Sequence, residues 1–141
     1  MRVHEVFRVA GRTLVTTSSH IVLLLVSASI LLLSYSTRNS EAVNLVPVLA
    51  SIAGLTIVEY GKHTYNQLFY SILISGATPK HLNLLKVAIS FIIALPLSLS
   101  TISSNRVAIV LFTLVLSGTS SLALLTYYAR KVKESCSATI V

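Results

Sequence analysis

The chain has 141 residues, of which 54% are hydrophobic and only 11% are charged, and its formal net charge is +7. Soluble domains carry about 25% charged residues, so this chain has too few charges to cover a soluble surface. Its apolar residues gather in runs of roughly 20, the length that crosses the hydrocarbon core of a bilayer. The composition therefore predicts one all-α integral membrane domain and excludes a separate soluble domain. Because the basic residues bracket the apolar runs, we interpret them as topology signals and expect no nucleic-acid partner.

The first expected element is an amphipathic helix over about residues 2–16. Its apolar residues recur at helical spacing, whereas Arg2, Arg8 and Arg12 fall largely elsewhere. This pattern is typical of a helix that lies in the membrane interface with its basic face toward anionic headgroups, which makes membrane lipids an expected partner. A plain disordered basic tail is the alternative. The apolar stripe consists of Val3, Val6, Phe7, Ala10 and Leu14.

Membrane spans are expected at about residues 20–36, 42–58, 84–104 and 107–128, followed by a tail at 129–141. The link TRNSEA is short, so the first two spans should form a tight antiparallel pair. Lys and Arg are concentrated before the first span, between the second and third, and after the fourth, which is the bias of cytoplasmic segments. The sequence thus predicts a four-helix bundle in the cell membrane with both termini in the cytoplasm.

Small residues in these spans indicate close helix contacts, and one proline indicates a possible hinge. Small residues four apart let another helix approach closely. A proline within a span frees a backbone carbonyl and usually kinks the helix, so Pro96 in IIALPLSLS is a hinge candidate, with a static packing kink as the alternative. The residues expected at close helix contacts are Ala50, Gly54, Ser117, Gly118 and Ser121.

The motifs that carry catalysis or cofactor binding are missing from the sequence. It has no HExxH, no paired carboxylates, no Ser/His/Asp set and no phosphate-cradling glycine loop. Its one cysteine, Cys136, allows neither an internal disulfide nor a metal-ligand spacing. We therefore expect no catalytic residue, no cofactor and no metal, and we do not expect an enzyme.

The segment at about residues 60–80, between spans two and three, is far longer than a connecting loop requires. Its apolar residues recur at i, i+3, i+4, i+7 and i+8, which predicts a helix with one apolar face. This helix should end at Ile74 or Ser75. The apolar face consists of Tyr65, Leu68, Phe69, Ile72 and Leu73.

A sharp turn should follow this helix. Gly76 is the natural residue just past a helix end, and Thr78 can cap a second helix that has Pro79 at its first position. The second helix runs on into span three. The segment is therefore expected to form an elbow, a helix and a turn that present Lys80 and His81 to the cytoplasm.

The stretch EYGKHTYNQLFYSILISGATPKHLNLLKVAIS resembles the segment after the second span of ABC transporter permeases of the type-2 (exporter) class, and SGATPKHL is similar to the turn of FtsX-like permeases. The resemblance places Glu59 at the acidic position, residues 65–75 at the amphipathic run, and Lys86 at the basic position of the next span. In those permeases this element is the coupling helix, which docks on a separate nucleotide-binding subunit. The resemblance implies a docking surface made of Glu59, Lys62, Gln67, Gly76, Ala77, Thr78, Pro79, Lys80, His81 and Lys86.

Two functions stay open. The first is a permease-like subunit of an ATP-driven ABC-type transporter, whose cytoplasmic ATPase must be a separate chain because this one has no GxxxxGK[ST]. Four spans are too few to enclose a sizeable pathway, so a second membrane subunit or a homodimer is implied. The second is a non-catalytic structural or accessory subunit of a larger membrane complex. Type-2 permeases usually have six spans, which leaves open a reduced permease, one part of a split permease, or a partner that has lost transport.

Overall fold

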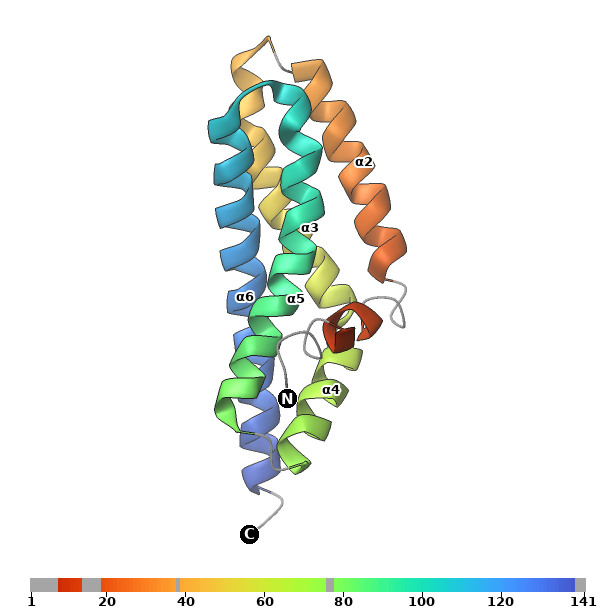
Figure 1. Ribbon diagram of the computed structural model, residues 1–141, viewed down its shortest axis with the longest axis vertical. Coiled ribbons are helices and arrows are strands. Elements are labelled where there is room, and N and C mark those ends of the chain that lie inside the picture. The colour runs from red at the N-terminus through yellow and green to blue at the C-terminus, as the bar shows by residue number, and fades with distance from the viewer. Residues whose placement is uncertain (1–7, 14–18, 38, 76–77, 139–141) are drawn as a thin grey trace.

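The computed structural model describes residues 8–13, 19–37, 39–75 and 78–138, and in these ranges every regular element is helical (Figure 1). Residues 8–13 are helical and lie beside α4, where Val9, Arg12 and Thr13 adjoin Leu68. The rest of the expected interfacial helix, residues 2–7 and 14–16, lies outside the described residues. The longer elements are α2 (Ser19–Thr37), η1 (Glu41–Leu45), α3 (Val46–Tyr60), α4 (Lys62–Ile74), α5 (Pro79–Leu99), η2 (Ser100–Ser104) and α6 (Val107–Ala138).

Among the described residues, four helical segments are long and apolar enough to cross a membrane, which supports the expected all-helical, multi-pass membrane protein. The helix of span three has the expected start, whereas the helix of span four extends further than the sequence pattern indicated. α5 begins at Pro79, and α6 runs past residue 128 to Ala138 because neither proline nor glycine interrupts it after Gly118. At a rise of 1.5 Å per residue the 32-residue α6 is roughly 48 Å long, so it exceeds a hydrocarbon core of about 30 Å. The four segments are His20–Thr37, Glu41–Tyr60, Pro79–Ser104 and Val107–Cys136.

α6 is the central helix of the bundle, with α3 and α5 packed along it and α4 against its C-terminal part (Figure 1). α2 lies at the edge and meets the bundle chiefly where its C-terminal end contacts η2. There Ser34 Oγ donates to the carbonyl of Thr101 at 3.4 Å, and Ser103 Oγ donates to the carbonyl of Leu31 at 3.3 Å. Most leucines of α2 are exposed, as Leu24 is at 65%, and in a bilayer such side chains face lipid.

The contact between α3 and α6 is close because small residues meet there. Ala50, Ser117 and Ser121 are fully buried, and Gly54 is buried beside the two serines. A Cβ atom added at Gly54 would lie 2.9 Å from Ser121 Oγ and 3.6 Å from the carbonyl oxygen of Ser117. A side chain at position 54 would therefore collide with the hydroxyl of Ser121, whereas the backbone of α6 would lie at an ordinary contact distance.

Gly118, the residue after Ser117 in α6, lies at the contact between α6 and α5. A Cβ atom added at Gly118 would lie 3.7 Å from Ala94 Cβ, an ordinary van der Waals distance, and Ser90 Oγ donates to the carbonyl of Gly118 at 2.5 Å. Further along α5, Pro96 is half-buried in the last turn, and its carbonyl accepts from the N–H of Ser100 where the chain tightens into η2. The proline thus stands near the end of α5, and its role as a hinge stays a prediction.

Candidate partner-docking site

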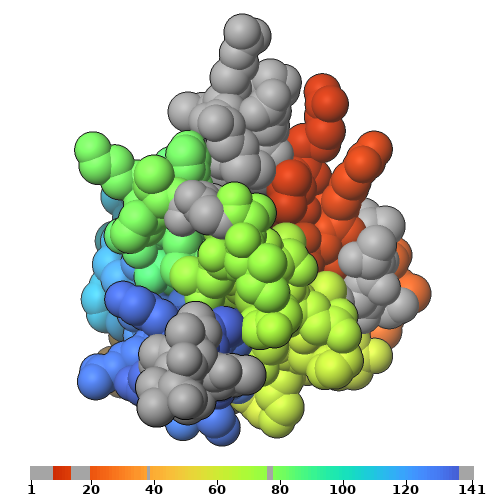
Figure 2. Space-filling view, turned by 90° about the horizontal axis from the view of Figure 1, so that it is seen from below, coloured from red at the N-terminus to blue at the C-terminus, as the bar shows by residue number. Residues whose placement is uncertain are grey.

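One end of the bundle gathers α4, the start of α5, the end of α6 and residues 8–13. Figure 2 looks onto this end and shows α4 between the blue end of α6, the green start of α5 and the red residues 8–13. The charged residues of the described ranges concentrate here, whereas Glu41 and Arg106 stand at the opposite end. This end is strongly basic. Its cations are Arg8, Arg12, Lys62, Lys80, Lys86, Arg130, Lys131 and Lys133, and its carboxylates are Glu59 and Glu134.

The apolar face of α4 attaches this helix to the rest of the protein. Tyr65 and Phe69 are fully buried, Leu68 and Ile72 are half-buried against the core, and Leu73 is half-buried. Gln67 lies on the exposed side, with its Nε2 atom 3.1 Å from Nε2 of His63. Because most of the apolar side is used within the chain, the exposed side of α4 is the part of this helix that can meet another protein.

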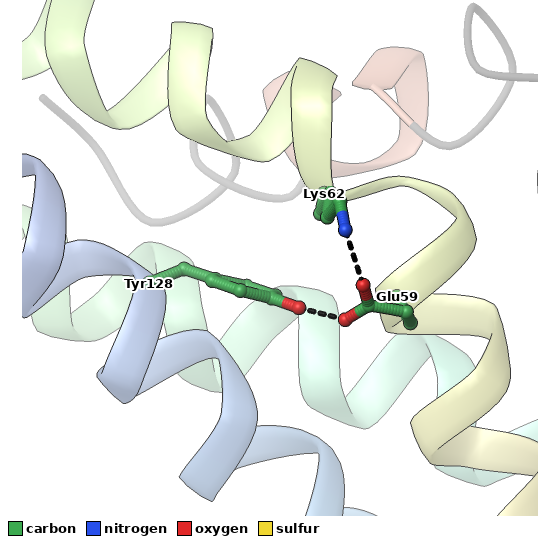
Figure 3. A network of polar contacts seen from close by, with 3 residues as sticks. All are labelled: Glu59, Lys62 and Tyr128. Carbon is green, nitrogen blue, oxygen red and sulfur yellow. Dashed lines mark hydrogen bonds and ion pairs between the residues drawn. The ribbon is translucent and has the colours of Figure 1, made fainter.

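A polar junction holds the start of α4 in place (Figure 3). Glu59, in the last turn of α3, forms an ion pair with Lys62 in the first turn of α4, with Oε1 and Nζ 2.5 Å apart. Its other carboxylate oxygen accepts a hydrogen bond from the hydroxyl of Tyr128 on α6. A carboxylate near a helix C-terminus is disfavoured by the helix dipole, and both partners offset that cost. Three helices thus meet at one carboxylate.

The turn between α4 and α5 departs from one expectation. Gly76 and Ala77 lie outside the described residues, α4 ends at Ile74, and Pro79 is the first residue of α5. Thr78 has the extended backbone of a capping residue, φ −67° and ψ 152°, but its side chain bonds no backbone N–H in the described part of α5. The expected side-chain cap is wrong, because the Thr78 hydroxyl lies 3.0 Å from Nδ1 of His81, which the first turn of the helix brings within reach.

The residues expected to dock a partner fall into three separate groups. Thr78, Pro79 and Lys80 are exposed together, and His81 is half-buried beside them. Glu59 and Lys62 are joined at the start of α4, with Gln67 about one turn away. Lys86 lies deeper, with only 9% of its surface exposed, so it is not part of the exposed turn.

Tyr128 is the residue of the junction that sequence reasoning missed. It is 7% exposed and stands two positions before Arg130, at the place where a membrane span usually carries aromatic residues. That signal indicates the interface but names no partner, since no sequence spacing relates residue 128 to residue 59.

Comparison with family models, with curated proteins and with solved structures finds no match for this chain. A function is therefore argued from the geometry of the chain itself.

Proposed function

We propose that this chain is a permease-like membrane subunit of an ATP-driven ABC-type transporter, and that it docks a separate cytoplasmic ATPase through the α4–α5 elbow. The observation that carries the proposal is a 13-residue helix that lies outside the four candidate spans of the described residues and is nonetheless packed against the bundle. Its apolar face is buried, its start is tied to α3 and α6 through Glu59, and the exposed Lys80 follows it. A loop that only joined two spans would need a few residues.

The proposal puts the basic end of the bundle in the cytoplasm, because cytoplasmic segments carry the excess of Lys and Arg. We expect a membrane-impermeant thiol reagent to label Ser40→Cys, in a Cys136→Ser background, in intact cells. Ser75→Cys in that background and the native Cys136 should react only after permeabilisation. Ser40 and Ser75 are both exposed, so accessibility to solvent does not separate them. Labelling of Ser75→Cys from outside would show the opposite orientation, in which a cytoplasmic ATPase could not contact the elbow.

The docking step is tested by reversing one charge. Lys80→Glu should leave the bundle folded, because a solvent-facing charge contributes little to stability. It should weaken capture of the ATPase subunit by about tenfold if Lys80 meets an acidic groove, and more strongly at low salt, where electrostatic attraction is less screened. The measurement is a pull-down from mild detergent, beside thermal unfolding of each variant.

Arg106→Glu is the matched control, because it reverses one exposed charge at the opposite end. It should bind the ATPase like the unaltered chain. If Lys80→Glu folds and binds fully, the elbow is only an interfacial anchor and the permease proposal loses its main support.

The accessory-subunit alternative is favoured by the close packing of α3 on α6. A path through a single chain would have to part the helices that meet at Gly54 and Ser121. Transport would therefore need a pathway shared with a second membrane subunit or a second copy. Stimulation of the ATPase by the reconstituted chain favours the permease function, whereas stable assembly with a membrane complex that contains no such ATPase favours the accessory one.

A further inference from the structure

A pocket of about 240 Å³ lies between the end of α4, the first two turns of α5 and the last part of α6. Three of its lining residues are cations contributed by two helices: Lys86 from α5, and Arg130 and Lys133 from α6. None of the described residues that line it is acidic. Its other walls are largely apolar, with two polar side chains among them. They consist of Leu73, Pro79, Leu82, Asn83, Thr126 and Ala129.

Lys86 is the residue of this pocket that most strongly indicates an anionic ligand. It is 9% exposed, and within the described part of the chain it forms no ion pair and no side-chain hydrogen bond. Burial of most of this lysine leaves its ammonium group only partly hydrated, and an anion in the pocket would stabilise that charge. Arg130 is partly satisfied, since its Nε atom lies 3.0 Å from Oε1 of Glu134, whereas that carboxylate does not line the pocket.

The level of the pocket relative to a membrane can be inferred from the positions of the charged residues along α5 and α6. α6 has no charged residue between its start and Arg130, and α5 has none after Lys86. The uncharged part of α6, from residue 107 to 129, is roughly 35 Å long at 1.5 Å per residue, close to the thickness of a hydrocarbon core. In a bilayer that covers this uncharged length, Lys86 and Arg130 would stand together at the level of the lipid headgroups.

We propose that this pocket binds the headgroup phosphate of an anionic phospholipid from the adjacent leaflet. Lys86 and Lys133 supply point charges, and Arg130 adds a planar donor group that suits phosphate. The N-terminus of α5, which begins at Pro79 on the pocket wall, adds the positive end of a helix dipole. The apolar walls suit the glycerol and the first methylenes of a lipid, which a free phosphate ion would leave exposed. This inference does not depend on the proposed transport function.

The test uses the full chain in a zwitterionic detergent and measures both thermal unfolding and bound lipid by native mass spectrometry. The probes are dioctanoyl phosphatidylglycerol, dioctanoyl phosphatidylcholine and inorganic phosphate at equal concentrations. We expect the phosphatidylglycerol to raise the unfolding temperature and to be retained, and the other two to do neither. Lys86→Met should weaken its binding by about tenfold, the order expected for loss of one charge-assisted hydrogen bond.

Two further variants make the result specific. Lys133→Gln changes an exposed lysine of the same pocket and should also weaken binding, so the test does not rest on a buried position alone. Lys80→Gln removes the same charge from α5 outside the pocket and should bind the lipid normally.

Four outcomes overturn the proposal. An equal effect of inorganic phosphate makes this a free-anion site, and an equal effect of phosphatidylcholine shows no selection of anionic headgroups. An equal loss in Lys80→Gln shows a general attraction to the net charge of the chain. Unchanged binding in both Lys86→Met and Lys133→Gln shows that the lipid binds outside this pocket.

Discussion

Gly54→Ala is expected to lower the free energy of unfolding by about 1–3 kcal/mol, the usual cost of forcing an extra methyl into a well-packed contact. The new Cβ atom would lie 2.9 Å from Ser121 Oγ, closer than real Cβ contacts, so α3 and α6 would have to move apart or Ser121 would have to rotate. The measurement is thermal unfolding in detergent, and a cysteine pair across α3 and α6 would report their separation.

Ser121→Ala should restore most of that loss. With the hydroxyl removed, the nearest atom to the new Cβ is the carbonyl oxygen of Ser117 at 3.6 Å, an ordinary contact. Ser121 Oγ is buried without a hydrogen-bond partner among the described residues, so Ser121→Ala alone should be neutral or slightly stabilising.

Gly118→Ala is the matched control, because its Cβ would meet nothing closer than Ala94 Cβ at 3.7 Å and should be tolerated. Equal destabilisation by both glycine variants would show that lost glycine flexibility matters rather than the α3–α6 contact. A double variant no more stable than Gly54→Ala alone would show that Ser121 does not cause the clash.

Glu59→Ala is expected to destabilise the attachment of α4 by about 1–3 kcal/mol, because it leaves the buried hydroxyl of Tyr128 without its acceptor and removes the partner of Lys62. Glu59→Gln keeps an oxygen for Tyr128 and loses only the half-exposed ion pair, so its effect should be about 0–1 kcal/mol. Hydrogen exchange should show faster opening of α4 in Glu59→Ala, with α2 unchanged.

A double-mutant cycle tests the hydrogen bond between Tyr128 and Glu59 separately from the ion pair between Glu59 and Lys62. Tyr128→Phe combined with Glu59→Ala should cost little more than Glu59→Ala alone, because both remove the same hydrogen bond. Glu134→Ala is the control, since the ion pair of Glu134 with Arg130 is 65–81% exposed and should contribute little. Strictly additive effects of Tyr128→Phe and Glu59→Ala would mean that the two side chains are not paired in the folded protein.

The four apolar helices and the existence of α4 could be predicted before any coordinates, because both depend on local chemistry. A segment in lipid must satisfy its own backbone hydrogen bonds, so a long apolar run has little choice but to be a helix. The apolar spacing from Tyr65 to Leu73 likewise predicts an amphipathic helix from residues only a few positions apart. The small residues at Gly54 and Ser117 indicated close approach in the same way.

The choice of neighbours could not be predicted, because it depends on contacts between residues far apart in the chain. Lipid tails are as apolar as leucine, so hydrophobicity alone does not determine which faces of two spans meet. Only the packing of α6 between α3 and α5 brings Tyr128 to Glu59, 69 positions away. The same packing brings Arg130 and Lys133 to Lys86, which the sequence had grouped with the exposed elbow. Periodicity along one helix reports which side is apolar, whereas the partner of each side is determined by the shapes and polar groups that meet across the bundle.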